Sequence, residues 1–233
     1  MSPAPALRGR VKILPTGPAT LDCEPPVKHA FAFIFAVAAF AQQHEIGADL
    51  GYGIYKGGSI ISGVGTAKAS IRNRFAAGIT LGEEFNDYFA GEFRYLFHDG
   101  HPYLQAPGVN TDIQGQSHTL TLDLLIHFKR RDRRLRPFLA GGVGGKDYVI
   151  AGPEPFPQPI PQIASLTTND VWKVVFDVGG GATYVFRQNV LLRMDFKDYL
   201  TTFPRQQTVP APHNTARGVF HQFTVLFGVS YTF

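Results

Sequence analysis

The sequence predicts an all-β fold, a transmembrane eight-stranded antiparallel up-and-down β-barrel that follows an N-terminal signal peptide. Three observations support this prediction. Apolar and polar side chains alternate in segments of about ten residues, which is the strand period and the length that a tilted strand needs to cross a bilayer. The connections between these segments are alternately long and short. The last segment is long and apolar on one face and continues to Phe233.

An apolar run, Ala30–Phe40, has the layout of a secretory signal peptide. Lys28 and His29 supply the positive region before it, and Ala39-Phe40-Ala41 supplies a cleavage site of the A-x-A type. The run is too short to cross a bilayer as a helix. We therefore expect cleavage after Ala41.

The chain then divides into a leader with its signal peptide, residues 1–41, and a barrel domain, residues 42–233. The Pro-rich stretch before the signal, Met1–Pro26, has no hydrophobic pattern, and a translation start at Val27 would give the signal an ordinary length. Cleavage would remove Cys23, the only cysteine, with four of the 22 basic and two of the 18 acidic residues. The remaining charge of about +2 is too small to favour nucleic-acid binding.

The first three alternating segments are Glu45–Tyr55, Ile71–Gly82 and Tyr88–His98. Each places aliphatic or aromatic side chains on one face, as a half-buried strand does. These apolar faces are Ile46, Ala48, Leu50, Tyr52 and Ile54; Phe75, Ala77, Ile79 and Leu81; and Phe89, Phe93, Tyr95 and Phe97.

The fourth and fifth segments are His118–Phe128 and Pro137–Ile150. The fourth has the cleanest alternation, with a leucine, isoleucine or phenylalanine at every second position from Leu120. The fifth is rich in glycine, so the sequence leaves its facing open.

The last three segments are Val171–Phe186, Val190–Tyr199 and Val219–Phe233. In the final one, apolar residues alternate with small and polar ones, and Leu226 is the apolar exception on the polar face. The three apolar faces are Val174, Phe176, Val178, Ala182, Tyr184 and Phe186; Val190, Leu192, Met194 and Phe196; and Phe223, Val225, Phe227, Val229, Tyr231 and Phe233.

The connections alternate in length along the whole chain. Long loops cover residues 56–70, 99–116, 151–170 and 201–218, and short turns cover 83–87, 129–136 and 187–189. An up-and-down barrel with both termini on one side has this pattern, with short turns in the periplasm and long loops outside.

The polar faces carry charges of both signs, which predicts ion pairs inside a narrow lumen, where an unpaired charge would be costly. The opposite, apolar faces suit lipid, and Tyr52, Tyr95, Tyr184 and Tyr231 are candidates for an interfacial girdle. Arg72, Arg74 and Lys173 also lie on the polar faces. The predicted lumen charge network is Asp49, Glu92, Arg94, Asp123, Asp177, Arg193, Asp195 and Lys197.

Three features carry a family resemblance: Arg136–Gly144 (RPFLAGGVG), Val178–Gly181 (VGGG) and the Phe-ended last segment. With them, the chain resembles the OmpA-like β-barrel family of outer-membrane proteins and surface antigens. The resemblance implies a location in the outer membrane of a Gram-negative-type bacterium and a mostly plugged interior. The implied partners are outer-membrane lipid and the barrel assembly machinery, and we expect the barrel to be a monomer. It also implies a C-terminal assembly signal formed by Phe227, Val229, Tyr231 and Phe233. Longer family members carry a peptidoglycan-binding domain, for which this sequence has no counterpart, so a cell-wall anchoring role is not expected.

The residues that could carry chemistry do not form a recognisable motif. The Gly-rich run before Lys146 lacks the first glycine of a phosphate loop and is followed by Asp147 instead of Ser or Thr. His98 and His101 could bind a metal with Asp99, but two loop histidines are more often solvated. The basic cluster of residues 129–136 could touch anionic headgroups, and hydration is the favoured interpretation.

His127 is the remaining candidate for catalysis. It shares a face with Asp123 and Thr121, and some eight-stranded outer-membrane barrels modify lipid A, but no serine adjoins it. We expect a luminal histidine bonded to a carboxylate. The sequence therefore predicts no catalytic residues, no cofactor and no metal.

The favoured function is a structural or surface-exposed role without catalysis. Three alternatives stay open: a narrow low-conductance pore, a lipid A-modifying enzyme, and a soluble ligand-binding barrel with its aromatic faces turned inward.

Overall fold

The computed structural model of the protein describes residues 43–63, 65–202, 206–217 and 219–233, which belong to one compact unit. The predicted signal peptide, its cleavage site and Cys23 lie outside the described residues. Within the described ranges, no helix has the length and apolar character that crossing a membrane requires.

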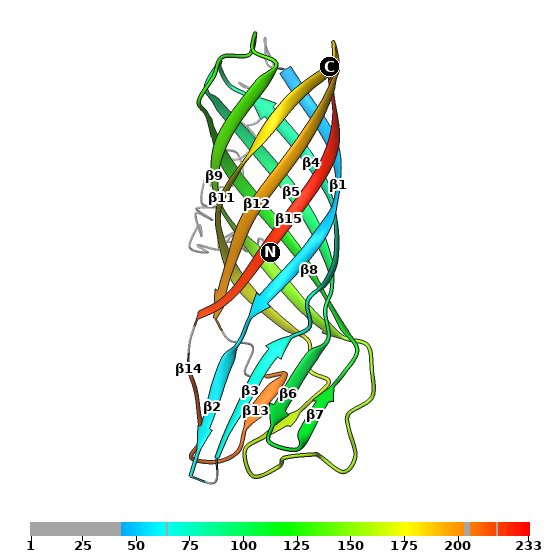
Figure 1. Ribbon diagram of the computed structural model, residues 1–233, viewed down its shortest axis with the longest axis vertical. Helices are drawn as coiled ribbons and strands as arrows, with labels where there is room; N and C mark the ends of the chain where they lie inside the picture. The colour runs from blue at the N-terminus through cyan, green and yellow to red at the C-terminus, as the bar shows by residue number, and fades with distance from the viewer. Residues whose placement is uncertain (1–42, 64, 203–205, 218) are drawn as a thin grey trace, which may run out of the picture. The chain divides into compact units, whose positions relative to one another are not determined.

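Eight long strands form a closed antiparallel barrel (Figure 1). Each strand pairs with its neighbours in chain order, and β1 pairs with β15 to close the ring, for example at Leu50 opposite Phe227. This confirms the predicted fold class. The barrel strands are β1 (Gln43–Lys56), β4 (Arg74–Glu84), β5 (Phe89–Asp99), β8 (Gly115–His127), β9 (Leu135–Ile150), β11 (Val171–Arg187), β12 (Val190–Thr202) and β15 (Val219–Thr232).

The apolar faces of the strands point out of the barrel. Leu122 is 64% exposed and Phe227 59% exposed, whereas the polar faces are buried in the lumen. Since a soluble ligand-binding barrel needs the opposite arrangement, the outward apolar belt fits a barrel solvated by lipid. In β9, whose facing the sequence left open, Leu139 and Val143 point outward and Phe138 and Lys146 point into the lumen.

Several strand ends lie one to three residues from the predicted ones, and one of these differences marks a break in the strand. The second barrel strand begins at Arg74, not at Ile71, because Ile71 ends the separate strand β3 (Gly65–Ile71). At the break, Asn73 Oδ1 accepts a hydrogen bond from the Tyr55 backbone N–H at 2.8 Å. The Tyr52 hydroxyl donates to the Asn73 carbonyl at 2.9 Å. These bonds hold a bend that the apolar alternation does not reveal.

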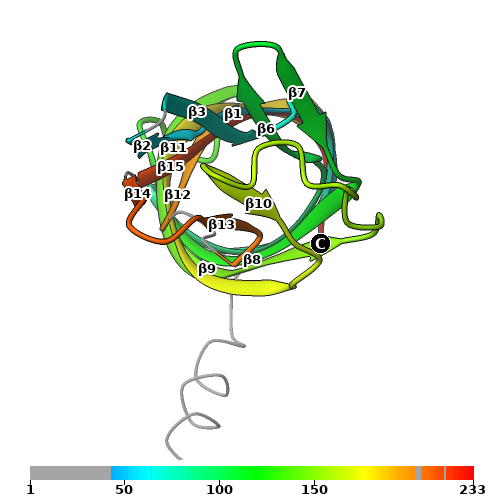
Figure 2. The ribbon, with the colours of Figure 1, turned by 90° about the horizontal axis from the view of Figure 1, so that it is seen from below.

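The long connections, predicted only as loops, contain seven short strands. Five of them form one sheet in the order β14-β2-β3-β6-β7, which we name the loop sheet. Two more, β10 (Ala164–Leu166) and β13 (Thr208–Pro210), pair with each other and lie across the barrel opening in the end-on view (Figure 2). Besides β3, the strands of the loop sheet are β2 (Gly58–Ser62), β6 (Pro102–Ala106), β7 (Val109–Asp112) and β14 (Thr215–Arg217).

The loop sheet has a hydrophobic core of its own. Its inward side chains, including Ile60, Ala67 and Leu104, are fully buried. They pack in one cluster with Ile163 and Leu166 from the connection between β9 and β11. Burial of this apolar surface stabilises the long loops as a folded layer at one end of the barrel.

Candidate functional site

The centre of the lumen holds a four-membered cluster of alternating charges. Arg94 is fully buried, and its Nε donates to Glu92 Oε1 at 2.8 Å while an Nη pairs with Asp195. Arg193 lies 2.5 Å from Glu92 and 3.0 Å from Asp195. Glu92 and Arg94 come from β5, and Arg193 and Asp195 from β12. These strands are four positions apart in the eight-stranded ring, so the ion pairs cross the lumen from wall to wall.

A second cluster lies beside the first. Lys197 of β12 pairs with Asp123 of β8 and, at 3.2 Å, with Asp177 of β11, and all three side chains are fully buried. Asp49, the eighth residue of the predicted network, also faces the lumen, where its carboxylate accepts a hydrogen bond from Thr80 at 2.7 Å. Among the ion pairs of the described residues, Asp49 takes part in none. Glu45, which the sequence did not single out, lies 3.8 Å from Arg193.

The three other charged residues of the predicted polar faces, Arg72, Arg74 and Lys173, take no part in these two clusters. Arg74 pairs with Asp99 at 3.0 Å, and both side chains are partly exposed. Arg72 pairs with Asp112 of the loop sheet at 3.6 Å. Lys173 lies opposite Lys146 in the pairing of β11 with β9.

Apolar side chains fill further lumen layers. One buried cluster joins Leu96, Tyr199 and Leu226, and another joins Leu125 and Phe138. This explains why Leu226 interrupts the polar face of the last strand: its side chain packs inside the barrel. The sequence shows Leu226 as an apolar residue on a polar face, but periodicity alone could not distinguish a residue that packs in the lumen from an irregularity of the pattern.

The histidines with candidate chemistry are dispersed. His98 is buried in the lumen, with Nε2 3.3 Å from the Thr224 hydroxyl, whereas His101 lies 3.6 Å from Asp99 and 3.4 Å from Asp112. The described residues contain no cluster of three or more possible metal ligands. His127 makes an edge contact with Phe138, with 5.5 Å between ring centroids.

The carboxylate that shares the face of His127, Asp123, is engaged by Lys197. His127 Nδ1 is buried without a described hydrogen-bond partner. The expected bond from this histidine to a carboxylate is therefore not among the described contacts.

Several basic side chains of the turn between β8 and β9 are engaged in ion pairs. Arg131 and Arg136 both pair with Glu84, and Arg130 donates to Asp87 at 2.9 Å. The bond to Asp87 raises the pKa of the Arg130 guanidinium above its ordinary value. Three of the basic side chains thus link this turn to the neighbouring one.

The predicted assembly signal lies at the outer surface of β15. The side chains of Phe227, Val229, Tyr231 and Phe233 are all exposed. The Phe233 backbone exchanges hydrogen bonds with His44 of the first strand, at 3.0 and 3.1 Å. Phe233 is therefore held by main-chain pairing, while its ring is exposed and lies 5.8 Å from the His44 ring, centroid to centroid.

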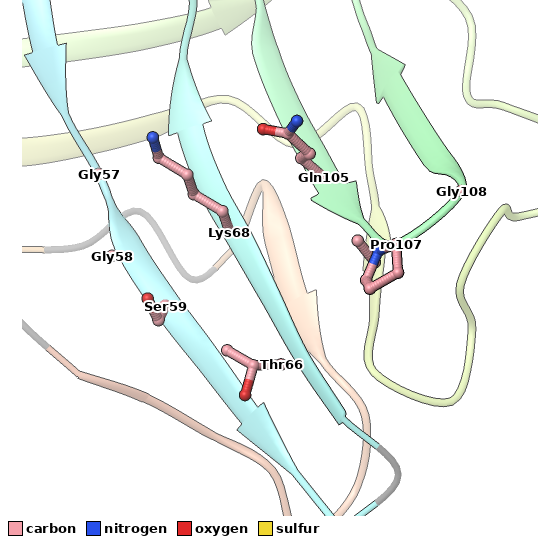
Figure 3. A pocket seen from close by; sticks show the side chains of 9 residues that line it. Gly57, Gly58, Ser59, Thr66, Lys68, Gln105, Pro107 and Gly108 are labelled. Atoms are coloured by element: carbon pink, nitrogen blue, oxygen red, sulfur yellow. The ribbon is translucent and has the colours of Figure 1, made fainter.

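The loop sheet carries two adjacent hollows that sequence reasoning missed. The first, of about 540 Å³, is lined by Ser59, Thr66, Lys68, Gln105 and Pro107 among others (Figure 3). The second, of about 370 Å³, shares Lys68 and Gln105 with the first. It adds Arg72, Asn73, Tyr103 and Asn110.

The sequence matches the family described as "Outer membrane protein beta-barrel domain" over residues 29–233. No curated protein matches it. Similar solved structures include Neisserial surface protein A (NspA), 15% identical, covering 82% of this chain and 97% of that one, with a TM-score of 0.49. The N-terminal β-barrel domain of Pseudomonas aeruginosa OprF is 14% identical, covers 82% and 97%, and has a TM-score of 0.47. Ail of Yersinia pestis, in complex with the heparin analogue sucrose octasulfate, is 11% identical, covers 82% and 99%, and has a TM-score of 0.42.

Proposed function

The chain belongs to the outer-membrane protein β-barrel family, and from that premise we propose that it is a non-catalytic surface protein. Family membership places it in the outer membrane of a Gram-negative bacterium, with its apolar belt in lipid. In this proposal the barrel is an anchor, and the loop sheet is the part that is presented outside the cell for recognition.

The proposal rests on a contrast between the barrel lumen and the long loops. The lumen is crossed by buried ion pairs and filled by apolar layers, which leaves little room for permeation or for a substrate. The long loops, by contrast, are folded into a sheet with its own core and two surface hollows. A folded, exposed layer on a rigid scaffold is where binding function concentrates in proteins.

The orientation follows from the connection lengths. Short turns face the periplasm and long loops face outside in barrels of this class. We further propose that residues 1–41 are the leader and signal peptide, that residues 42–233 form a monomeric barrel, and that Phe227, Val229, Tyr231 and Phe233 are read by the barrel assembly machinery.

The orientation is tested by labelling introduced cysteines on intact cells with a maleimide too large to cross the outer membrane. In a Cys23→Ser background, Thr66→Cys in the loop sheet should react on intact cells. Asp132→Cys, in the exposed turn at the other end, should react only after the outer membrane is permeabilised. Labelling of Asp132→Cys on intact cells, or its absence at Thr66→Cys, would reverse or remove the proposed orientation.

Two measurements distinguish a non-catalytic membrane anchor from a pore and from a lipid A-modifying enzyme. In planar bilayers the purified protein should produce no steady ion conductance, because the charges that cross the lumen are mutually paired. The lipid A of cells that express the protein should keep its mass. A stable channel would establish the pore alternative, and a mass change that depends on the protein would establish the enzyme.

A further inference from the structure

The outward face of the loop sheet carries a row of hydrogen-bonding side chains. Ser59 lies opposite Lys68, Lys68 opposite Gln105, and Gln105 opposite Asn110, across β2, β3, β6 and β7. Directly opposed residues in a sheet share one face. Figure 3 shows Ser59, Lys68 and Gln105 projecting together from their strands. The row therefore presents a hydroxyl, an ammonium and two amide groups side by side.

The two hollows on this face share part of their lining, and we name them together the trough, which crosses the row along the direction of the strands. Both contain Lys68 and Gln105, and together they extend from the Pro107–Gly108 turn to Arg72 and Asn73. Two of its lining residues are glycines that the backbone requires: a Cβ added to Gly57 would overlap the Ala69 carbonyl oxygen of the paired strand, and Gly108 has a φ of 77°, which favours glycine.

The trough has a positive charge that the surrounding residues compensate only in part. Neither hollow is lined by a carboxylate. Lys68 is exposed and takes part in none of the ion pairs described for the chain. Arg72 lies over the Tyr103 ring at 5.0 Å and is 3.6 Å from Asp112 at the trough's edge. The trough is thus lined by amides, hydroxyls, an aromatic ring and two cations, and by no carboxylate. Such a lining suits a sugar chain that carries acidic groups.

One end of the trough lies beside an outward-facing tyrosine of the barrel. Tyr52 belongs to the outward aromatic face of β1, and its hydroxyl donates to the carbonyl of Asn73, which lines the trough. Tyrosines of this kind mark the headgroup level of a bilayer. From there the trough runs into the loop sheet. The acidic sugars nearest to that position are those of the surrounding outer leaflet, the phosphorylated core of lipopolysaccharide.

We propose that the trough between β2, β3 and β6 binds the phosphorylated core saccharide of lipopolysaccharide, with Lys68 contacting an acidic group and Gln105 and Ser59 contacting sugar hydroxyls. This inference rests on the proposed function, because it requires the loop sheet to lie outside the cell.

The test measures binding of phosphorylated core oligosaccharide, released from lipid A, to the full-chain protein in detergent by titration calorimetry. Lys68→Glu should weaken binding about fivefold to tenfold, because it removes one surface attraction and adds a repulsion of similar size. Lys129→Glu makes the same charge change in the exposed turn at the opposite end of the barrel. It should change the affinity less than about twofold. Enzymatic removal of the phosphates should weaken binding to the unmodified chain by a similar factor.

The heat-dependent gel mobility of each variant reports whether its barrel has folded, and Lys68→Gln replaces Lys68→Glu if the latter does not fold. The proposal is overturned by a lack of saturable binding to the unmodified chain, or by equal losses in the Lys68 and Lys129 variants. Binding of heparin, a soluble sulfated polysaccharide, without binding of the core saccharide would also overturn it, in favour of an extracellular glycan. In each of these cases the cysteine-labelling result still decides the proposed surface role independently.

Discussion

Replacing Lys197 by methionine should be one of the most destabilising single changes in the lumen. Lys197 is the only cation within ion-pair distance of Asp123 and Asp177 among the described residues. Lys197→Met removes the ammonium, keeps a side chain of similar length, and leaves two fully buried carboxyl groups without a cation.

The size of the effect follows from this connectivity. Removing one partner of a buried ion pair costs about 3–5 kcal/mol, because the remaining charge is uncompensated. We expect Lys197→Met to lower the free energy of unfolding by about that amount. Arg94→Met should cost less, about 1–3 kcal/mol, since Glu92 and Asp195 both keep Arg193 as a partner.

Urea unfolding of the protein in detergent micelles measures this loss. The chain has a single tryptophan, Trp172, which is 64% exposed on the outer face of the barrel, so its emission changes when unfolding removes it from the apolar phase. Lys129→Met, at an exposed turn, is the matched control and should change stability by less than about 0.5 kcal/mol.

A second variant isolates the electrostatic cause. Combining Lys197→Met with Asp123→Asn and Asp177→Asn removes all three charges and should recover most of the loss, because neutral replacement of a whole buried ion cluster is often tolerated. An unchanged unfolding midpoint for Lys197→Met would refute the reasoning. So would a triple variant as unstable as the single one, which would show that packing and not charge sets the cost.

Three further predictions concern the wall, the turns and the C-terminus of the barrel. A Cβ at Gly144 would overlap the Leu120 carbonyl, so Gly144→Ala should cost about 3 kcal/mol. Gly141→Ala, whose added Cβ would have its nearest atom at 3.7 Å, should be nearly neutral in the same urea assay. Glu84→Gln should cost about 2 kcal/mol in thermal unfolding, because it weakens the pairs to two arginines; an unchanged melting temperature would mean that these pairs are only solvated contacts. Phe233→Ala should reduce the amount of heat-modifiable protein recovered from outer membranes. The free energy of unfolding of the folded fraction should change by no more than about 1 kcal/mol. Equal recovery would show that the ring is not part of the proposed assembly signal.

The alternation of side chains was sufficient to predict the barrel. The faces of strands such as His118–Phe128 depend only on the period of an extended chain, so local sequence determines which side meets lipid. Counting the alternating segments predicted the number of strands, and the alternation of long and short connections predicted their up-and-down order. Side-chain periodicity could not predict two features. The glycines of β9 have no side chain, so the sequence does not indicate which face of that strand points outward. Ile71 fits the apolar pattern of the second segment, so the pattern did not reveal the break before Arg74.

The tertiary structure decided the features that join segments far apart in the chain. The alternation of side chains indicated that charges of both signs face inward, but only barrel closure brings β5 opposite β12, so that Arg94 reaches Asp195 across the lumen. The loop sheet likewise pairs short strands from different connections, each too short to be recognised alone, and its trough exists only because Lys68 and Gln105 become neighbours. Periodicity is a property of one strand, whereas these contacts arise from the register between strands, which the closed ring fixes and the linear sequence does not display.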